Sequence, residues 1–467
     1  MSNKPNLEEI VSLAKRRGFV FPTSEIYGGL TSSYDYGPMG SVLIKNIKDA
    51  WWQEFILNRD DMYGLDSQIL LNPETWVASG HVNSFTDPLV EDKVTHLRYR
   101  ADHVIKNWLK NQKKSELDQL NVNDLSTTEM GQIIKQYQIT SPDGNELTPP
   151  KDFNILFETA IGAVAGEKSL VYLRGETAQG IFSNFKQVLN STRAKLPFGI
   201  GQIGKSFRNE ITSGQFLFRQ LEFEQAEIEF FFDPTQTNWQ ELMEDWKKQM
   251  LNFATNTLGI NADDLSWRRH TDQERSHYSK DTYDLDYQFS FGWDELWGLA
   301  YRTDFDLKQH MQHSGESLEY IDPNTHQKII PHVMEPAVGI DRLFLMVLTD
   351  AYKQDGERLY LDLKPSLAPY QVAVFPLLRN KPELVKQATA IFQSLCKEFR
   401  TTFDDRGNIG KRYLYQDEIG TPFCITVDFD TAQDNCVTIR DRNSTAQERV
   451  SLDKISNFLS EKIQVNK

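Results

Sequence analysis

Apolar and polar positions alternate in patterns that change three times along the chain. Up to about Arg100, a loop reading GGLTSSYDYGPMG precedes apolar residues that recur at helix-like spacing: Val42, Ile44, Ile47, Trp51, Trp52 and Phe55. Such a stripe predicts a helix that packs either inside the chain or against a second subunit. Between Lys110 and Pro150 the chain becomes polar and rich in turn residues, which predicts an insertion.

From Phe153 to about Pro234, short apolar runs follow the polar, turn-rich stretch. The run GIGQIGKSFRNE and the run FLFRQLEFEQAEIEFFFDP are joined by ITSGQ, and the short Ser-Gly connection predicts an antiparallel hairpin. With a period of two, Arg208 shares a face with Glu210, and Phe223 shares a face with Gln225 and Glu227. Arginine can grip phosphate, a carboxylate can accept from the adenine amine, and a ring can stack on a base. A solvated hairpin face would explain the same alternation.

A third segment, HVMEPAVGIDRLFLMVLTDAY, carries a second arginine. Gly339 ends an extended piece, and Arg342 lies in the first turn of a predicted apolar helix. The helix dipole disfavours a cation there unless an anion is nearby, so this position indicates an anion site. Glu295, in FSFGWDELWGLAYRTDFDL, adds an acid suited to Mg2+ bridging phosphates, although a surface strand acid is the plain alternative.

The region after about Leu367 has its own organisation. YQVAVFPLL, TTFDD, PFCITVDF and CVTIRDR predict strands, and the stripe from Leu384 to Phe399 predicts a helix, with another at the end of the chain. Alternating strands and helices predict a separate α/β domain with a mixed sheet.

Composition narrows the class of protein. The 467 residues, 39% hydrophobic, predict two or three domains, and a net charge of -15 argues against indiscriminate nucleic-acid binding. The three cysteines are too far apart for a metal knuckle, so neither disulfides nor structural zinc is expected. A charged N-terminus and short apolar runs predict a soluble, cytoplasmic protein without a membrane segment.

Together, YDYGPMG with its helix, FRNE with RQLEFEQAE, and GIDRLFLMVL resemble motifs 1, 2 and 3 of class II aminoacyl-tRNA synthetases. The chain is similar to the homodimeric glycyl-tRNA synthetase family over nearly its whole length. The segments that carry this similarity are ASGHVNSF, RADH, LRGETAQGIF, LPFGIGQIGKSFRNEIT and QDEIGTPF. The resemblance implies an α+β fold, in which an antiparallel sheet flanked by helices precedes a C-terminal α/β anticodon-binding domain. It implies a catalytic domain at 1–366, with insertions at about 105–150 and 235–285, and an anticodon-binding domain at 367–467.

The resemblance also implies roles for individual residues. Catalysis would use Arg208, Glu210 and Arg342. ATP would contact Arg208, Asn209, Glu210, Phe218, Arg219, Glu222, Phe223, Glu295, Leu296, Gly339 and Arg342, with Mg2+ on Glu295. Glycine would contact Arg100, Glu176, Phe223, Gln225, Glu227, Glu335, Ala337 and Gly339. The anticodon domain would contact tRNA through Arg406, Lys411 and Arg412, with Arg440 and Arg442 as further candidates.

Four positions depart from the family pattern. Gly175 stands where the family has proline before Glu176, Ala337 where serine is common, and Asp294 where glycine precedes the Glu-Leu pair. A turn at residues 141–144, SPDG, stands where many bacterial relatives carry a CPxCG zinc knuckle.

The expected function is glycine activation by ATP, with pyrophosphate release, followed by transfer to tRNA(Gly) by a homodimer. An acidic, crowded pocket can select the smallest amino acid by excluding larger ones, so no editing domain is required. The alternatives are a synthetase for another small amino acid, a catalytically silent paralogue that acts as an RNA-binding or accessory subunit, and an ATP-dependent ligase that does not use tRNA.

Overall fold

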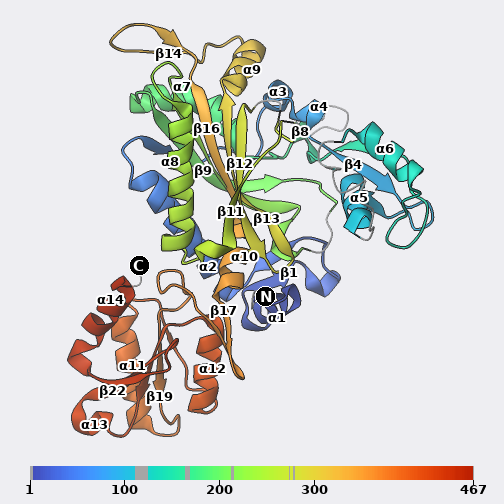
Figure 1. The fold of residues 1–467 in the computed structure, drawn as a ribbon. Coiled ribbons are helices and arrows are strands. Elements are labelled where there is room, and N and C mark those ends of the chain that lie inside the picture. The colour runs from blue at the N-terminus through green and yellow to red at the C-terminus, as the bar shows by residue number, and fades with distance from the viewer. Residues whose placement is uncertain are drawn as a thin grey trace.

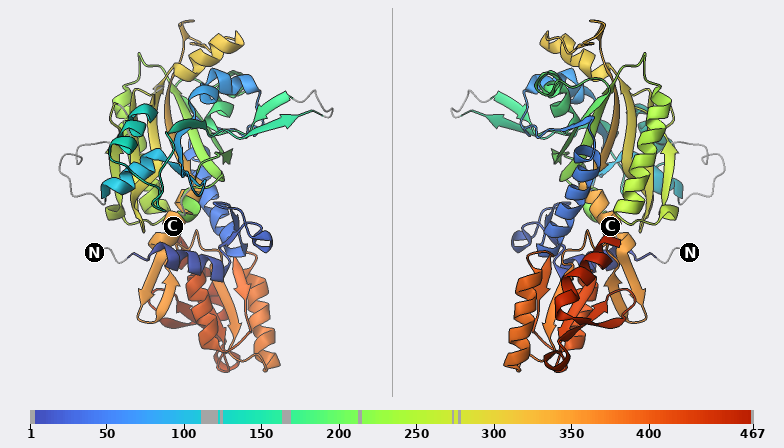
Figure 2. Two further views of the ribbon diagram at one scale, coloured as in Figure 1. Left: turned by 90° about the vertical axis from the view of Figure 1, so that its right-hand side faces the viewer. Right: turned by 90° about the vertical axis from the view of Figure 1, so that its left-hand side faces the viewer.

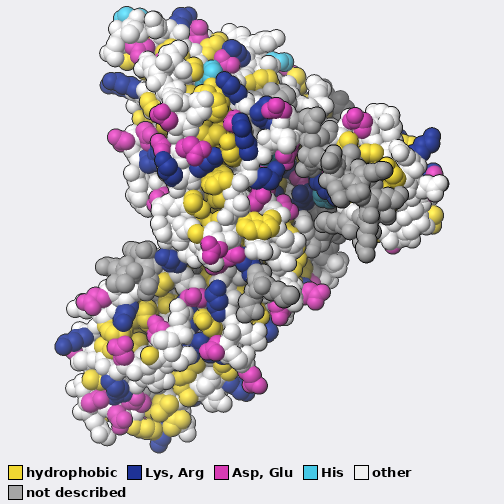
Figure 3. Space-filling view, in the orientation of Figure 1, with side chains coloured by type: hydrophobic (Ala, Val, Ile, Leu, Met, Phe, Trp, Pro, Cys, Tyr) yellow, Lys and Arg dark blue, Asp and Glu magenta, His cyan; other side chains and the backbone are white. Residues whose placement is uncertain are grey.

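The computed structural model describes residues 4–110, 122, 125–162, 169–211, 215–272, 274–276 and 279–465. The chain forms a large part built around one sheet and a smaller C-terminal part below it in Figure 1. Among the described residues, no helix has the length and apolar character needed to cross a membrane. Acidic and basic side chains are interspersed over the face drawn in Figure 3.

Seven strands form the main sheet in the order β11-β12-β13-β16-β10-β9-β3. Neighbouring strands are antiparallel except β3 and β9, which are parallel. The strands are β3 (Met62–Gly64), β9 (Phe198–Phe207), β10 (Glu222–Phe232), β11 (Leu265–Arg269), β12 (Asp281–Phe289), β13 (Gly292–Thr303) and β16 (His332–Gly339). The antiparallel sheet and its helices confirm the predicted fold class.

Helices cover both faces of this sheet (Figures 1 and 2). The helices α2 (Pro38–Trp52), α8 (Trp239–Asn252) and α10 (Ile340–Ala351) pack in one core, and α7 (Ala178–Thr192) and α9 (Phe305–Ser314) in another. Strand β10 separates the two cores, because its even-numbered residues, from Ala226 to Phe232, join the first and Phe231 joins the second. This alternation confirms that Phe223, Gln225 and Glu227 share a face.

The predicted apolar stripe after the GGLTSSYDYGPMG loop forms α2 and the π-helical turn η2 (Gln53–Leu57) that follows it. Ile47, Trp51 and Phe55 are almost fully buried, and the Phe55 ring lies 5.6 Å from that of Trp297 on β13. Of the two possibilities left open by the sequence, the stripe therefore packs inside the chain. Gly40 permits this packing, since a Cβ there would lie 1.9 Å from the carbonyl oxygen of Phe19.

Strands β9 and β10 pair as the predicted hairpin, but the predicted short turn was wrong. β9 ends at Phe207 and β10 begins at Glu222, and Phe216–Phe218 form a short 3-10 helix, η4, between them. Arg208 and Glu210 therefore lie in the connection rather than on a strand face. The tip residues 212–214 fall outside the described residues.

The predicted insertion near residues 105–150 belongs to a lobe that begins earlier. It contains β4 (Thr86–Glu91), β5 (Arg98–Arg100), α5 (Ala101–Lys110), α6 (Thr127–Gln136) and β6 (Lys151–Asn154), with an apolar core of its own. By contrast, the stretch predicted as a second insertion, about 235–285, lies within the main architecture. It supplies α8, with buried Trp246, and β11, which forms one edge of the main sheet.

Asp92 holds two loops of the first lobe together. Its Oδ1 accepts from the backbone N of Val94 and of Thr95, at 2.8 and 2.9 Å. Its Oδ2 accepts from Ser141 Oγ at 2.6 Å and Asn145 Nδ2 at 3.0 Å. These contacts join the 92–97 loop to the SPDG turn through hydrogen bonds.

Several smaller elements complete the large part. Strands β7 (Glu158–Ile161) and β8 (Ser169–Tyr172) form a two-stranded arm that projects from the molecule in Figure 2. The remaining helices are α1 (Leu7–Arg17), η1 (Glu25–Tyr27), α3 (Pro73–Ala78), α4 (His81–Ser84), η5 (Phe253–Thr257) and η6 (Ala262–Asp264). The remaining strands are β1 (Val20–Pro22), β2 (Tyr34–Tyr36), β14 (Tyr320–Ile321), β15 (Lys328–Ile329), β17 (Tyr352–Asp355) and β18 (Arg358–Leu361).

The C-terminal part contains a mixed sheet, as predicted, and its five strands lie in the order β20-β19-β21-β22-β23. Its strands are β19 (Val372–Pro376), β20 (Thr401–Phe403), β21 (Phe423–Val427), β22 (Cys436–Asp441) and β23 (Gln447–Ser451). Its helices are α11 (Pro382–Leu395), α12 (Ile409–Ile419), α13 (Thr431–Asp434), the short η7 (Leu452–Lys454) and α14 (Ile455–Val465). Strand β23 was not predicted from the sequence.

Candidate active site

A cavity of about 240 Å³ opens on the face of the main sheet that carries the odd-numbered side chains of β10. The residues after β9, the end of β16 and the start of α10 converge there. Its lining is Glu176, Arg208, Glu210, Leu217, Phe218, Arg219, Gln220, Phe223, Gln225, Glu227, Glu295, Gly298, Glu335, Ala337, Val338, Gly339, Asp341 and Arg342. Arg208 and Arg342, far apart in sequence, therefore share one cavity.

Arg208 is fixed by backbone contacts and by two rings. Its backbone N donates to the carbonyl of Leu221 at 3.0 Å, and its Nε donates to the carbonyl of Gly175 at 3.0 Å. The guanidinium carbon lies 5.1 Å from the Phe85 ring centre and 5.3 Å from that of Phe223. The remaining guanidinium nitrogens are available for a phosphate.

Arg342 lies in the first turn of α10, as predicted. Its Nη1 donates to the carbonyl of Glu295 at 2.9 Å and lies 3.2 Å from Glu295 Oε2. Burial raises the pKa of Glu295, but Arg342 outweighs this and holds that pKa below its usual range. Glu295 is therefore ionised at neutral pH, which suits a hard cation such as Mg2+.

Glu210 lies on the cavity wall beside another cation. Its Oε2 is 3.4 Å from Nε of Arg219. The Arg219 Nη1 is buried and has no hydrogen-bond partner among the described residues. An unpaired donor of this kind is free to bind an incoming anion.

Three buried carboxylates form the acidic wall of the cavity. Glu227 accepts from the backbone N of Thr177 at 2.8 Å, from the Thr177 hydroxyl, and from Gln225 Nε2 at 3.0 Å. Glu335 accepts from Nη1 of Arg302 at 2.8 Å. Glu176, on the loop before α7, accepts from Gln179 Nε2 at 3.0 Å. Carboxylates in this arrangement can surround an ammonium group.

The three carboxyls do not share one protonation behaviour. Burial raises the pKa of Glu335 to about 8 and outweighs Arg302, while Glu227 and Glu176 raise it further. Burial, followed by the charge of Glu176, also raises the pKa of Glu227. Burial likewise acts on Glu176, but His81 and Arg302 hold the pKa of Glu176 below its usual range. Glu176 is therefore ionised at neutral pH.

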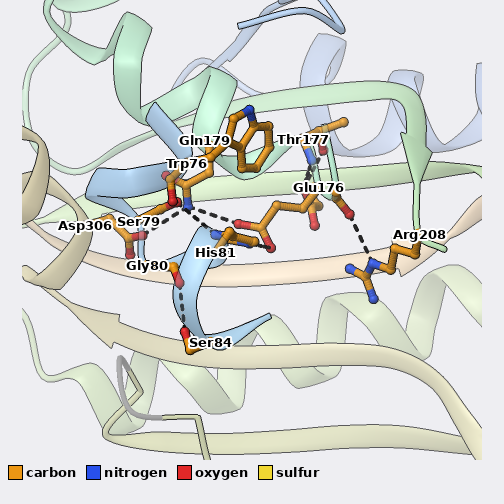
Figure 4. A network of polar contacts seen from close by, with 12 residues as sticks. Trp76, Ser79, Gly80, His81, Ser84, Glu176, Thr177, Gln179, Arg208 and Asp306 are labelled. Carbon is orange, nitrogen blue, oxygen red and sulfur yellow. Dashed lines mark hydrogen bonds and ion pairs between the residues drawn. The ribbon is translucent and has the colours of Figure 1, made fainter. Parts of the chain in front are cut away.

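A polar network lies behind this wall, and sequence reasoning missed it (Figure 4). Arg302 donates from Nε and Nη2 to Asp306, both at 2.8 Å. Gln179 bridges Glu176 to Asp306 and meets Nε2 of His310 at 2.9 Å. The one signal in the sequence was the four-residue spacing of Arg302 and Asp306 within FSFGWDELWGLAYRTDFDL, since their burial is seen only in the structure.

Four predicted site residues do not line the cavity. Arg100 pairs with Asp87 at 2.9 Å and with Asp102 at 3.0 Å, and Leu296 is buried in the main core. The backbone N of Asn209 donates to Ile155, and Glu222 pairs with Lys205 on the surface. The lining residues that were not predicted are Leu217, Gln220, Gly298, Val338 and Asp341.

The structure corrects the candidate tRNA contacts. Arg412 is buried and donates to the carbonyls of Pro376, Arg406 and Gly407. Arg440 is buried against Asp417, and Arg442 against Asp362 and nearby carbonyls. These three arginines hold the C-terminal part together because their donors are used internally. Arg406 and Lys411 are exposed, so they remain predicted contacts.

Two family descriptions match this chain. "tRNA synthetase class II core domain (G, H, P, S and T)" matches residues 164–351, and "Anticodon binding domain" matches residues 371–462. The chain is 48% identical to "Glycine--tRNA ligase" of Acetivibrio thermocellus over 471 residues, covering 99% of each chain. It is 47% identical to the enzymes of that name from Bacillus cereus and Staphylococcus haemolyticus, covering 98% of this chain and 99% of theirs.

This chain belongs to the glycine–tRNA ligase family.

Of the residues that depart from the expected pattern, Ala337 lines the cavity, and Gly175 and Asp294 each precede a lining residue, Glu176 and Glu295. A Cβ on Gly175 would lie 3.0 Å from Leu156 and from Phe85, so glycine leaves room for the ring that contacts Arg208. Ala337 lines the cavity without a hydroxyl. Asp294 accepts from the backbone N of Glu295 at 2.9 Å, and its charge acts on Arg342.

Proposed function

We propose that this protein is a glycine–tRNA ligase that activates glycine with ATP and transfers it to the 3' end of tRNA(Gly). The observation that carries the proposal is the convergence of two cation-bearing segments and an acidic wall on one cavity. ATP requires the cations, and the glycine ammonium requires the carboxylates. A core shared by synthetases for several amino acids does not by itself specify glycine.

Arg208 would bind the α-phosphate of ATP and stabilise charge as the glycine carboxylate attacks phosphorus and pyrophosphate leaves. Its contacts with Gly175 and Leu221 hold it in place before substrate arrives, which lowers the reorganisation needed in the transition state. Arg342 would bind the terminal phosphate. Phe223 would stack on adenine, and Glu210 would accept from its exocyclic amine.

Glu295 is the residue that would hold Mg2+. It provides one ionised carboxylate, so the phosphates of ATP and water would complete the oxygen ligands. The ion would neutralise charge on the phosphates. Glu295 also pairs with Arg342, which keeps the carboxylate beside the predicted position of the terminal phosphate.

Glu176, Glu227 and Glu335 would surround the glycine ammonium, with Gln225 and Ala337 beside them. The Gln225 Oε1 is buried and has no partner among the described residues, so it can accept from the ammonium. Exclusion of any larger side chain would select glycine.

The active assembly would be a homodimer in the cytoplasm, where tRNA is charged. Ile26 and Tyr27 are each 87% exposed and Leu30 is 60% exposed, on the loop before the motif 1 helix α2. Clustered apolar exposure of this kind is typical of a protein interface. Arg406 and Lys411 would contact the anticodon stem-loop.

ATP–pyrophosphate exchange with glycine, alanine and serine as separate substrates tests the proposal. We expect exchange with glycine, and subsequent charging of tRNA(Gly). A silent paralogue would support no exchange, and a ligase for another amino acid would exchange with that one instead. Either result would contradict the proposal.

A further inference from the structure

His81 is a buried histidine to which the sequence analysis gave no role. It begins α4, and its ring packs 5.2 Å from that of Trp76 and 4.8 Å from that of Phe85. Its Nε2 lies 3.4 Å from Oε2 of Glu176, on the acidic wall of the cavity (Figure 4). The side chain itself does not line the cavity.

Ser79 allows His81 to face a carboxylate in either protonation state. The Ser79 hydroxyl lies 2.8 Å from His81 Nδ1 and 3.3 Å from the carbonyl oxygen of Trp76. When the ring is neutral, the hydroxyl can donate to Nδ1 and leave the proton on Nε2. When the ring is charged, the hydroxyl can accept from Nδ1 and donate to Trp76. In both states Nε2 presents a proton to Glu176.

Each other element around Glu176 also contributes a charged or polar group. Gln179 of α7 donates to its Oε1, and Arg302 of β13 acts on it electrostatically. Glu227 of β10 and Glu335 of β16 carry like charge when ionised. Only His81 meets Oε2 directly among the contacts of the described residues, so this oxygen depends on it.

The backbone before Glu176 has little intrinsic rigidity, because residue 175 is glycine. The carbonyl of Gly175 is held by Arg208, and the N of Thr177 by Glu227. These contacts fix the chain on either side of Glu176. The direction of its carboxylate is then left to side-chain partners.

We propose that His81 is a positioning residue for glycine recognition, which holds Oε2 of Glu176 so that the carboxylate stays directed at the substrate ammonium. The inference rests on the proposed function. It assigns no reacting atom to His81, because the ring acts only through Glu176. It predicts a loss in glycine binding rather than in ATP binding.

The experiment compares His81→Leu and His81→Gln with the unchanged protein in ATP–pyrophosphate exchange at pH 6, 7 and 8. Leucine removes the donor, and glutamine retains a neutral one. Ser84→Ala is the matched control, since Ser84 lies on the same helix and, among the described residues, its hydroxyl bonds only the carbonyl of Gly80. Glycine KM, ATP KM and kcat are measured for each protein.

We expect His81→Leu to raise the glycine KM by about tenfold or more at pH 6, with little change in ATP KM. Without His81, burial raises the pKa of Glu176, so part of the population is protonated at low pH. The ratio of glycine KM between this variant and the unchanged protein should therefore fall from pH 6 to pH 8. His81→Gln should lie between the two proteins, and Ser84→Ala should match the unchanged one.

A ratio that does not change with pH would overturn the inference, because a purely structural defect gives that result. A glycine KM within about twofold of normal in both His81 variants, or an equal rise in ATP KM, would also overturn it. In these cases exchange by the unchanged protein leaves the proposed function intact. No glycine-dependent exchange by the unchanged protein would overturn both.

Discussion

Arg208 owes its suitability for catalysis to its surroundings as much as to its charge. The rings of Phe85 and Phe223 and the carbonyl of Gly175 fix the guanidinium before any ligand binds. A preorganised cation stabilises developing charge without a reorganisation cost at the moment of reaction. The residue should therefore matter for activation rather than for tRNA binding.

Replacement of Arg208 by alanine should lower glycine-dependent exchange by about a hundredfold to a thousandfold. Filter binding of tRNA(Gly) should stay close to that of the unchanged protein. Lys248→Ala, which removes an exposed cation on α8, is the control and should affect neither measurement. Equal losses in exchange and in tRNA binding would contradict the role assigned to Arg208.

Glu335 should make stability depend on pH. Its pKa of about 8 lies above the ordinary value of 4.5, so the folded state retains a proton that the unfolded state releases at neutral pH. The contribution of Glu335 to the free energy of unfolding is fully present below the pKa of the unfolded state. It is lost as the pH rises through about 8. From pH 7 to pH 9 the loss should be about 1 kcal/mol.

Glu335→Gln removes this ionisation while keeping the size of the side chain. In thermal unfolding, the decrease in Tm from pH 7 to pH 9 should be smaller in this variant than in the unchanged protein, by roughly 2 °C. Glu158→Gln alters an exposed carboxylate on β7 and should leave the decrease as it is. If Tm decreased equally in Glu335→Gln and in the unchanged protein, Glu335 would not titrate between pH 7 and pH 9, and the prediction would be wrong.

At the scale of elements, hydrogen bonds join two loops of the lobe around β4 to β6. Asp92 accepts four of them, and these bonds hold its pKa below the ordinary range even though burial raises it. The contribution of Asp92 to the stability of the folded state is therefore present at neutral pH. It is lost as the pH falls through the lowered pKa of this carboxyl.

Asp92→Ala should loosen both loops, because four donors lose their acceptor. Hydrogen exchange at the amides of Val94, Thr95 and Asn145 should become faster, while amides in the main sheet should be unaffected. Lys93→Ala breaks an exposed ion pair with Glu146 and should leave those amides protected. Unchanged protection in Asp92→Ala would show that the backbone pairing of this lobe suffices.

The whole molecule combines a large part and a C-terminal part with different roles. The large part forms the cavity, and the C-terminal part is held to it by ion pairs such as those of Arg16 and Arg17 with Glu418. The exposed Ile26, Tyr27 and Leu30 are left without cover in the single chain. A second copy is the partner that we propose for them.

Changing Ile26 and Tyr27 together to aspartate should convert a dimer into a monomer, because charges at an apolar interface lose hydration without a partner. Sedimentation velocity measures the change. Val94→Asp, at a residue that is 69% exposed on a different lobe, should leave the dimer intact. A double variant that sediments with the unchanged protein would place the interface elsewhere.

The order of the elements and many of the cavity residues could be predicted from the sequence. Periodicity predicted α2, the pairing of β9 with β10, and the C-terminal α/β domain, because local spacing decides which residues share a face. Arg208, Arg342, Phe223 and Glu227 could be recognised because each lies within a short motif at the end of a predictable element. The resemblance to glycyl-tRNA synthetases indicated glycine as the substrate, which composition alone could not indicate.

The tertiary structure alone decided which charged groups are buried together. Arg302 and Asp306 lie four residues apart, but His81 comes from a distant segment, and no local pattern indicates that it meets Glu176 behind the glycine wall. Arg412 showed the reverse error, since a basic residue on a helix resembles an RNA contact until its donors are seen on backbone carbonyls. Sequence fixes charge and spacing, whereas burial and partner depend on how distant segments pack.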